Sequence, residues 1–145
     1  MLLEIFNFLH FIGLAWGVGG ATAAAIISMK AEKNPEVAAS LMKIIPALSK
    51  LIWAGLVLLI ISGIAVTSLV KWPLDTNLLL IKHALVVLIV AIGALIFLRV
   101  KKMQKLAKPG EKPSEEFFKA KKQLGMLSIT NLALWYLIVL ISAFV

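Results

Sequence analysis

The two histidines of the chain, His10 and His83, are its most distinctive candidates for chemistry, because each lies within a long apolar run. An ionisable side chain inside a membrane is costly and usually marks a functional site. A neutral imidazole is a good iron ligand, and two imidazoles facing each other across a bundle supply both axial ligands of haem b. The pair therefore predicts a haem b site, with His10 as the first ligand and His83 as the second.

Small residues follow His10 along one face of a helix. Gly13, Gly17, Gly20 and Ala24 recur at spacings of three and four, which a 3.6-residue period brings into one row. A flat macrocycle needs such close backbone approach on at least one wall, so the row is expected to line the haem. The same small-xxx-small pattern is also typical of tight helix packing in membranes, and the sequence leaves both interpretations open.

Lys82 adjoins His83 but projects about 100 degrees away around the helix, so the two cannot serve one iron in the same way. Its ammonium group can reach the outer interface, pair with a porphyrin carboxylate, or act as a ligand or proton carrier once desolvated. If His83 faces lipid, Lys82 becomes the stronger candidate. We include both residues in the expected cofactor site.

Two further residues of that site are expected on the last helix. Asn131 and Trp135 lie on a stripe of polar and bulky side chains that recurs at helical spacing. Asn131 needs a hydrogen-bonding partner in hydrocarbon, and helix association is the ordinary use of such a residue. Trp135 is expected to line the porphyrin. On the first helix, Asn7 lies one turn outward of His10 and could orient its second ring nitrogen.

The composition is that of an integral membrane protein. Hydrophobic residues make up 61% of the 145 residues, and the mean hydropathy is +1.01, whereas soluble domains are about 45–50% apolar. The absence of cysteine excludes a disulfide, a thiolate metal site and a catalytic thiol. No Ser/His/Asp set, carboxylate pair or phosphate-binding loop indicates hydrolase or nucleotide chemistry. Because Glu4 replaces a cationic signal-peptide start, we expect the first apolar segment to be a retained helix.

Four segments are long enough to span a hydrocarbon core of about 30 Å, which needs roughly 20 apolar residues. They predict an all-α, antiparallel four-helix membrane bundle, formed by one domain over residues 1–145, with helices extending beyond the bilayer on the cytoplasmic side. The expected spans are residues 5–29, 51–70, 78–98 and 124–145.

The helix ends are also marked in the sequence. Asn34-Pro35 predicts the start of the second helix, Asp75 or Thr76 caps the third, and Ser114 caps the fourth. Pro46 predicts a bend in the second helix. The third helix is expected to continue to Leu106, and turns are expected at residues 71–76 and 108–113.

Basic residues set the expected orientation. Residues 99–122 contain nine Lys or Arg and residues 30–50 contain four, so thirteen of the fifteen lie on one side of a four-span chain. The positive-inside rule makes this side cytoplasmic and both termini external, in a multi-pass protein of the cell membrane. The net charge of +8 is then mostly a topology signal, with some attraction to anionic lipid, and nucleic-acid binding is not expected.

The same topology places the two imidazoles at similar depth. Helices one and three lie diagonally in an up-down bundle, and their histidines are roughly 12 Å and 9 Å below the outer end at 1.5 Å per residue. We therefore expect the iron near the outer leaflet and a role in electron transfer or in haem or porphyrin redox chemistry.

Two other functions remain open. A copper-handling or transport protein would use methionine sulfur, which suits Cu(I), but the methionines lack the close spacing of a copper motif. They are Met29, Met42, Met103 and Met126. A cofactor-free assembly subunit would use Asn131 and the glycine row for oligomerisation. The expected partners are lipid, further copies of the chain and a redox partner or porphyrin.

Four segments carry a resemblance that covers nearly the whole chain. They are LHFIGLAWGVGG at 9–20, Pro46 followed by WAGLVLLIISGIAV at 53–66, LLLIKHALVVLI at 78–89 and TNLALWYLIVLIS at 130–142. They resemble successive helices of copper-resistance-D-like proteins and of the related four-helix bacterial protoporphyrinogen oxidase (CopD/HemJ-like). The resemblance implies a four-helix bundle, often oligomeric. In the oxidase branch it implies haem b held by a first-helix histidine, here His10, and a functional lysine in the third helix, here Lys82.

The chain also departs from the oxidase pattern. The oxidases usually carry arginine and tyrosine-histidine residues after the first helix and a basic-aromatic cluster at the start of the second. The corresponding segments here read ATAAAIISMK and SLMKIIPALSK. The resemblance therefore supports a haem-binding scaffold more than it supports porphyrin oxidation, and it does not supply a role for His83.

Overall fold

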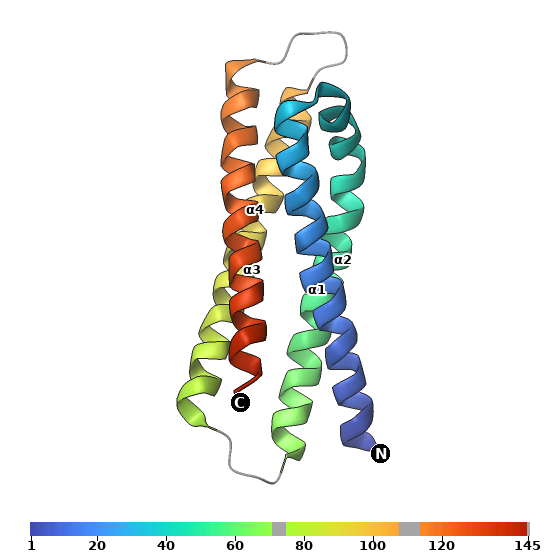
Figure 1. Ribbon diagram of the computed structural model, residues 1–145, viewed down its shortest axis with the longest axis vertical. Coiled ribbons are helices and arrows are strands. Elements are labelled where there is room, and N and C mark those ends of the chain that lie inside the picture. Colours follow the sequence, from blue (N-terminus) through green and yellow to red (C-terminus); the bar gives the residue numbers. More distant parts are fainter. Residues whose placement is uncertain (71–74, 108–113, 145) are drawn as a thin grey trace.

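The computed structural model describes residues 1–70, 75–107 and 114–144. Four long helices account for almost all of them (Figure 1): α1 (Leu2–Lys33), α2 (Pro35–Leu69), α3 (Thr76–Leu106) and α4 (Glu115–Ser142). The fold is all-α, as the sequence predicts. The helices extend past the expected spans, most clearly in α2, which runs unbroken through Pro46.

The predicted caps are present at the starts of three helices. The Asp75 carboxylate accepts hydrogen bonds from the backbone N–H groups of Asn77 and Leu78, at 2.9 and 3.1 Å. Ser114 Oγ accepts from Phe117 N–H at 3.2 Å, and Asn34 Oδ1 accepts from Val37 N–H at 3.4 Å. These bonds satisfy N–H groups that have no partner within the helix. The turns expected at 71–74 and 108–113 lie outside the described residues.

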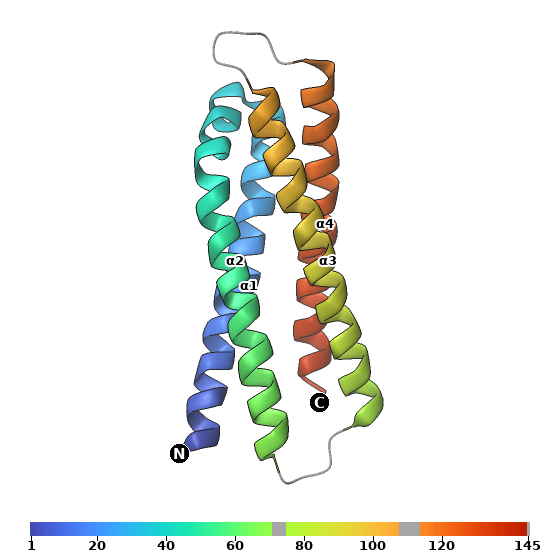
Figure 2. The ribbon, with the colours of Figure 1, turned by 180° about the vertical axis from the view of Figure 1, so that it is seen from behind.

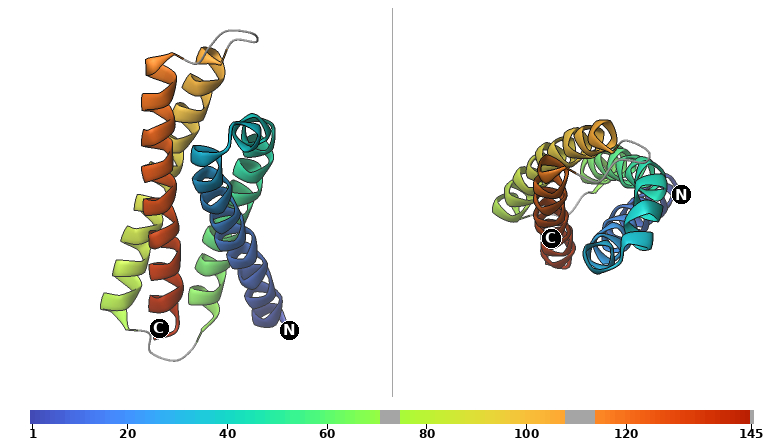
Figure 3. Two further views of the ribbon diagram at one scale, coloured as in Figure 1. Left: turned by 45° about the horizontal axis from the view of Figure 1, so that its top comes forward. Right: turned by 90° about the horizontal axis from the view of Figure 1, so that it is seen from above.

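The helices form an antiparallel up-down bundle. Both termini lie at one end, and the α1–α2 junction and the start of α4 lie at the other (Figure 1). Helix α1 packs most closely on α2, α3 packs on α4, and α1 also meets α4, whereas α2 and α3 barely approach each other. The views from behind and along the long axis show the same order (Figures 2 and 3). Helices α1 and α3 are therefore diagonal, as predicted.

All four helices are long and apolar enough to cross a membrane. The shortest has 28 residues, or about 42 Å at 1.5 Å per residue, against a hydrocarbon core of about 30 Å. Large apolar side chains such as Leu80 and Val87 are exposed on the outer surface. These observations describe a protein whose outer face is solvated by lipid and whose helices project beyond the hydrocarbon.

Two apolar clusters hold the bundle together. One lies toward the α1–α2 junction and is formed by Ala31, Leu41, Ile45, Val100, Met103, Ala120 and Leu124. The other is central and is formed by Ala21, Leu56, Leu85, Ile89, Trp135 and Ile138. Because residues from all four helices meet in each cluster, they fix the rotation of each helix about its axis, and thus which side chains face inward.

Candidate functional site

His10 is anchored to the neighbouring helix by a hydrogen bond between side chains. Its Nδ1 atom lies 2.9 Å from the hydroxyl oxygen of Ser62 on α2. Ser62 is only 1% exposed, and its hydroxyl donates to the backbone carbonyl of Leu58 at 2.5 Å. The imidazole is thus tied to α2 by a two-step chain of hydrogen bonds, from ring to hydroxyl to carbonyl.

This chain of bonds determines the protonation pattern of the ring. A carbonyl oxygen can only accept, so the single hydroxyl proton of Ser62 is used on Leu58. Ser62 Oγ must then accept from His10, which assigns the proton of the neutral ring to Nδ1. The lone pair remains on Nε2. Metal-ligating histidines are typically arranged in this way, with one nitrogen donating to a fixed acceptor and the other free to bind.

The backbone of α2 comes close to the same edge of the ring. A Cβ placed on Gly63 would lie 3.6 Å from His10 Cε1 and 4.0 Å from Nδ1, in ordinary van der Waals contact. Ser62 and Gly63 thus hold one edge of the imidazole against α2. Side chains on a helix lean toward its N-terminus, and this lean directs His10 toward the end of the bundle at which both termini lie.

On α3, Lys82 rather than His83 is partly withdrawn from the outer surface. The Lys82 side chain is partly buried. His83 is exposed, and its Nδ1–H donates to the carbonyl of Leu79 on its own helix at 2.7 Å. The expectation that both imidazoles face the interior is met by His10 and not by His83, because the adjacent position on α3 is the one that turns inward.

Helix packing fills the glycine row that was expected to line a macrocycle. A Cβ on Gly13 would lie 2.9 Å from the carbonyl oxygen of Gly55, and a Cβ on Gly20 would lie 2.7 Å from Ile52 Cγ1. A Cβ on Gly17 would overlap the indole ring of Trp135. The absence of side chains at these glycines therefore allows α1 to cross close to α2 and allows the ring of Trp135 to pack against α1. These contacts are those of the packing interpretation of the pattern.

Asn131 and Trp135 face the interior, as the stripe on the last helix predicts. They are 5% and 1% exposed. Among the described residues, neither Asn131 Oδ1 nor Trp135 Nε1 has a hydrogen-bonding partner. Trp135 belongs to the central apolar cluster and packs on Gly17. These two residues thus lie inside the bundle, but contacts with helix α1 account for the position of the indole ring.

His10 and Lys82 carry nitrogen atoms of a kind that can bind iron, whereas the glycines expected to cradle the ring are packed against neighbouring helices. His10 presents a free imidazole nitrogen, and Lys82 presents an amine from the diagonal helix. In the described part of the chain, no group of three or more His, Asp or Glu residues could hold a metal ion by itself. Of the methionines whose side chains the structure describes, Met29 and Met126 are exposed and Met103 lies in an apolar cluster.

The sequence interpretation missed Ser62. Asn7, which was expected to orient His10, is exposed, and Ser62 takes that role from 52 positions away. The only local signal was the Ser62-Gly63 pair within an apolar run of the second helix. The Ser62 hydroxyl donates to a carbonyl of its own helix, as serines within helices commonly do. Its contact with His10 on another helix therefore cannot be deduced from sequence spacing.

The fold and its apolar surface define a multi-pass integral membrane protein with four candidate spans. Within that class, residues 4–145 match the sequence model of the family described as "Predicted integral membrane protein (DUF2269)", and the chain belongs to this family. No curated protein and no solved structure matches the chain significantly.

Proposed function

We propose that the protein binds haem b in the membrane, with His10 Nε2 as the first axial ligand and the Lys82 amine as the second. The observation that carries this proposal is the hydrogen-bonded chain from His10 through Ser62 to Leu58, which leaves the Nε2 lone pair free. Such a fixed tautomer is what an iron ligand requires.

Lys82 replaces His83 as the second ligand in this proposal for a geometric reason. Lys82 is partly buried on the diagonal helix, whereas His83 is exposed and bonded to its own helix. An amine can bind iron only when it has lost its proton, and removal from water favours that form. The CopD/HemJ-like resemblance supports the same pair, since it implies a first-helix histidine and a third-helix lysine.

Haem bound by two axial ligands would supply one-electron redox chemistry, and an open sixth position would favour oxygen chemistry instead. We therefore propose electron transfer as the role, with a protoporphyrinogen-oxidase-like activity if the Lys82 position opens. The basic residues near the α1–α2 and α3–α4 junctions support an orientation with those junctions in the cytoplasm. His10 and Lys82 would then lie in the outer half of the bilayer.

A visible absorption spectrum of the detergent-purified protein, with any affinity tag removed, tests the proposal. We expect a Soret band, sharp bands on reduction, and a fixed haem-to-chain ratio in a pyridine haemochrome assay. A copper protein would bind metal stoichiometrically without a Soret band, and an assembly subunit would be colourless. Protein that is colourless from haem-supplied cells and binds no added haemin would refute haem binding.

Replacing Lys82 with leucine is expected to leave haem bound but to open one axial position. Leucine has no amine to bind the iron, so carbon monoxide should bind at the open position of the reduced protein. The Soret band should then shift. Spectra recorded with and without carbon monoxide measure this. His83→Leu is the matched control and should retain the spectrum of the unaltered protein. Carbon monoxide binding by His83→Leu alone would assign the second ligand to His83.

Replacing Ser62 with alanine is expected to weaken haem binding roughly 10–100-fold, because the acceptor that fixes the His10 tautomer is lost. Titration of the haem-free protein with haemin measures the change. Ser68→Ala is the control, since Ser68 is an exposed hydroxyl of the same helix that bonds only to the carbonyl of Ile64. Equal affinities for the two variants would contradict a role for Ser62 in orienting His10.

A further inference from the structure

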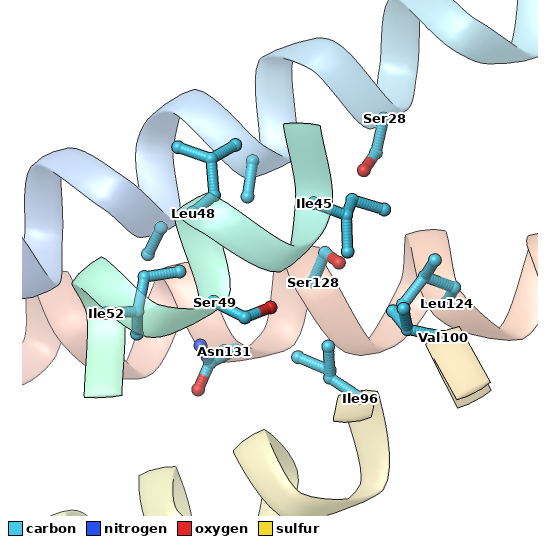
Figure 4. A pocket seen from close by; sticks show the side chains of 12 residues that line it. Ser28, Ile45, Leu48, Ser49, Ile52, Ile96, Val100, Leu124, Ser128 and Asn131 are labelled. Carbon is cyan, nitrogen blue, oxygen red and sulfur yellow. The ribbon is translucent and has the colours of Figure 1, made fainter. Parts of the chain in front are cut away.

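A small, partly open cavity of about 40 Å³ is lined by residues of all four helices (Figure 4). Its polar lining comes from three helices: Ser28 of α1, Ser49 of α2, and Ser128 and Asn131 of α4. Helix α3 contributes apolar side chains such as Ile96. The cavity, called the chamber below, thus has a mainly apolar lining that four polar side chains interrupt, and neither His10 nor Lys82 lines it.

Asn131 supplies the first sign that this chamber holds a ligand. Its side chain is 95% buried, since only 5% is exposed, and its Oδ1 atom forms no hydrogen bond with the described protein. A buried amide oxygen without a donor is unfavourable in an apolar medium. A donor from outside the chain would remove this cost.

The serine hydroxyls supply a second, independent sign. Elsewhere in the described helices, six hydroxyls donate to the carbonyl four residues back on their own helix. These are Thr22, Ser62, Thr67, Ser68, Thr130 and Ser142. No such bond is found for Ser28, Ser49 or Ser128, and these are the three that line the cavity. The serine hydroxyls that line the chamber are thus available to bond into it.

We propose that this chamber binds water, which bridges Asn131 to the serine hydroxyls of α1, α2 and α4. A single water needs about 10–15 Å³ of such space and two to four polar partners, so 40 Å³ accommodates more than one. Water supplies the donor that Asn131 Oδ1 lacks and both accepts from and donates to the hydroxyls. The bound water links α2 to α4, two diagonal helices without a close backbone approach.

The lining favours water over a metal cation. Every side chain around the cavity is uncharged, and hard cations in proteins are held by carboxylates as well as neutral oxygens. A bare charge in an uncharged apolar site would be strongly penalised. The volume is also too small for an organic ligand, since such sites occupy about 300–1,000 Å³.

The sign of the stability change in Asn131→Leu tests the proposal, because leucine has nearly the same shape as asparagine. If water bridges the Asn131 amide to the serines, replacing the amide leaves the water and the hydroxyls without a hydrogen-bonding partner. The unfolded-to-folded ratio should then rise about three- to tenfold. If the cavity is dry, removing an unpartnered polar atom should lower that ratio instead. Equilibrium unfolding in mixed micelles measures the ratio.

A double-mutant cycle with Ser49→Ala shows whether a bridge is responsible. Asn131 and Ser49 share no direct hydrogen bond in the structure. If water bridges them, the change in the unfolded-to-folded ratio of the double variant should be at least twofold smaller than the product of the changes in the two single variants. Ser68→Ala is the control partner and should combine multiplicatively with Asn131→Leu. Independent effects of Asn131 and Ser49 would overturn the proposal, as would stability that depends on sodium at constant ionic strength.

A crystal structure of the unaltered protein that resolves solvent gives a readout independent of variant folding. We expect water density within hydrogen-bonding distance of Asn131 Oδ1. A chamber without such density at a resolution where surface waters are clear would overturn the proposal even if the variants fail to fold.

Discussion

Leucine in place of Gly17 is expected to disrupt the bundle, with a loss of about 3 kcal/mol or more in unfolding free energy. Even a single added Cβ at this position would overlap the indole ring of Trp135. Trp135 is 1% exposed and packed in the central apolar cluster, so it has no free space into which it can move. The unfolding midpoint in mixed micelles and the elution profile of the purified protein measure the loss.

Gly19→Leu is the matched control for this prediction. Gly19 lies two positions away on the same helix, it is exposed, and a Cβ there would meet nothing within 4 Å. We expect a change within about 0.5 kcal/mol, as for surface substitutions without special contacts. Similar losses for Gly17→Leu and Gly19→Leu would show that helix conformation, rather than the contact with Trp135, determines the effect.

Replacing His10 with alanine is expected to abolish stable haem binding, the largest functional change that the proposed site predicts. The substitution removes the free Nε2 atom and leaves Lys82 as the only candidate ligand of the pair. It also leaves the Ser62 hydroxyl without its donor. Haem content per chain after purification measures the change, and circular dichroism shows whether the helices persist.

His83→Ala provides the comparison within the same chain. His83 is exposed and bonds to Leu79 of its own helix, so we expect this variant to keep its haem and its spectrum. The two substitutions remove the same side chain from similar depths. Equal loss of haem in both variants would favour a bis-histidine site, and retention in both would remove His10 from the proposed site.

The helix boundaries could be predicted from the sequence because their causes are local. Asn34, Asp75 and Ser114 each cap a helix through a bond to an N–H within the next three residues, and such bonds depend only on nearby residue types. The four spans follow from the length of apolar runs for the same reason. The up-down bundle then follows from short connections.

The inward face of α3 could not be predicted, because this helix is apolar on nearly every side and has no contrasting polar stripe. Lys82 and His83 differ by one position, so a rotation of about 100 degrees decides which of them is the more buried. That rotation is set by the packing of α3 on α4 through residues such as Leu85 and Ile89. Long-range contacts of this kind have no signature in local spacing.

The glycine row shows a different limit. Gly13, Gly17 and Gly20 do share one face, as their spacing predicts. A pattern of small residues indicates close packing at that face, but it does not identify the group that packs there. In the structure that neighbour is the backbone at Gly55, the side chain of Ile52 and the ring of Trp135. The same packing positions His10, because the close crossing of α1 and α2 brings Ser62 within bonding distance of its ring.

The central claim, that His10 Nε2 is an iron ligand, is tested most directly by labelling histidine in the His83→Ala variant. His10 is then the only histidine in the chain. With ¹⁵N-histidine incorporated, electron–nuclear double resonance of the ferric protein should show strong ¹⁵N coupling from one directly bound imidazole nitrogen. A haem-loaded variant without ¹⁵N coupling at the iron would contradict the account.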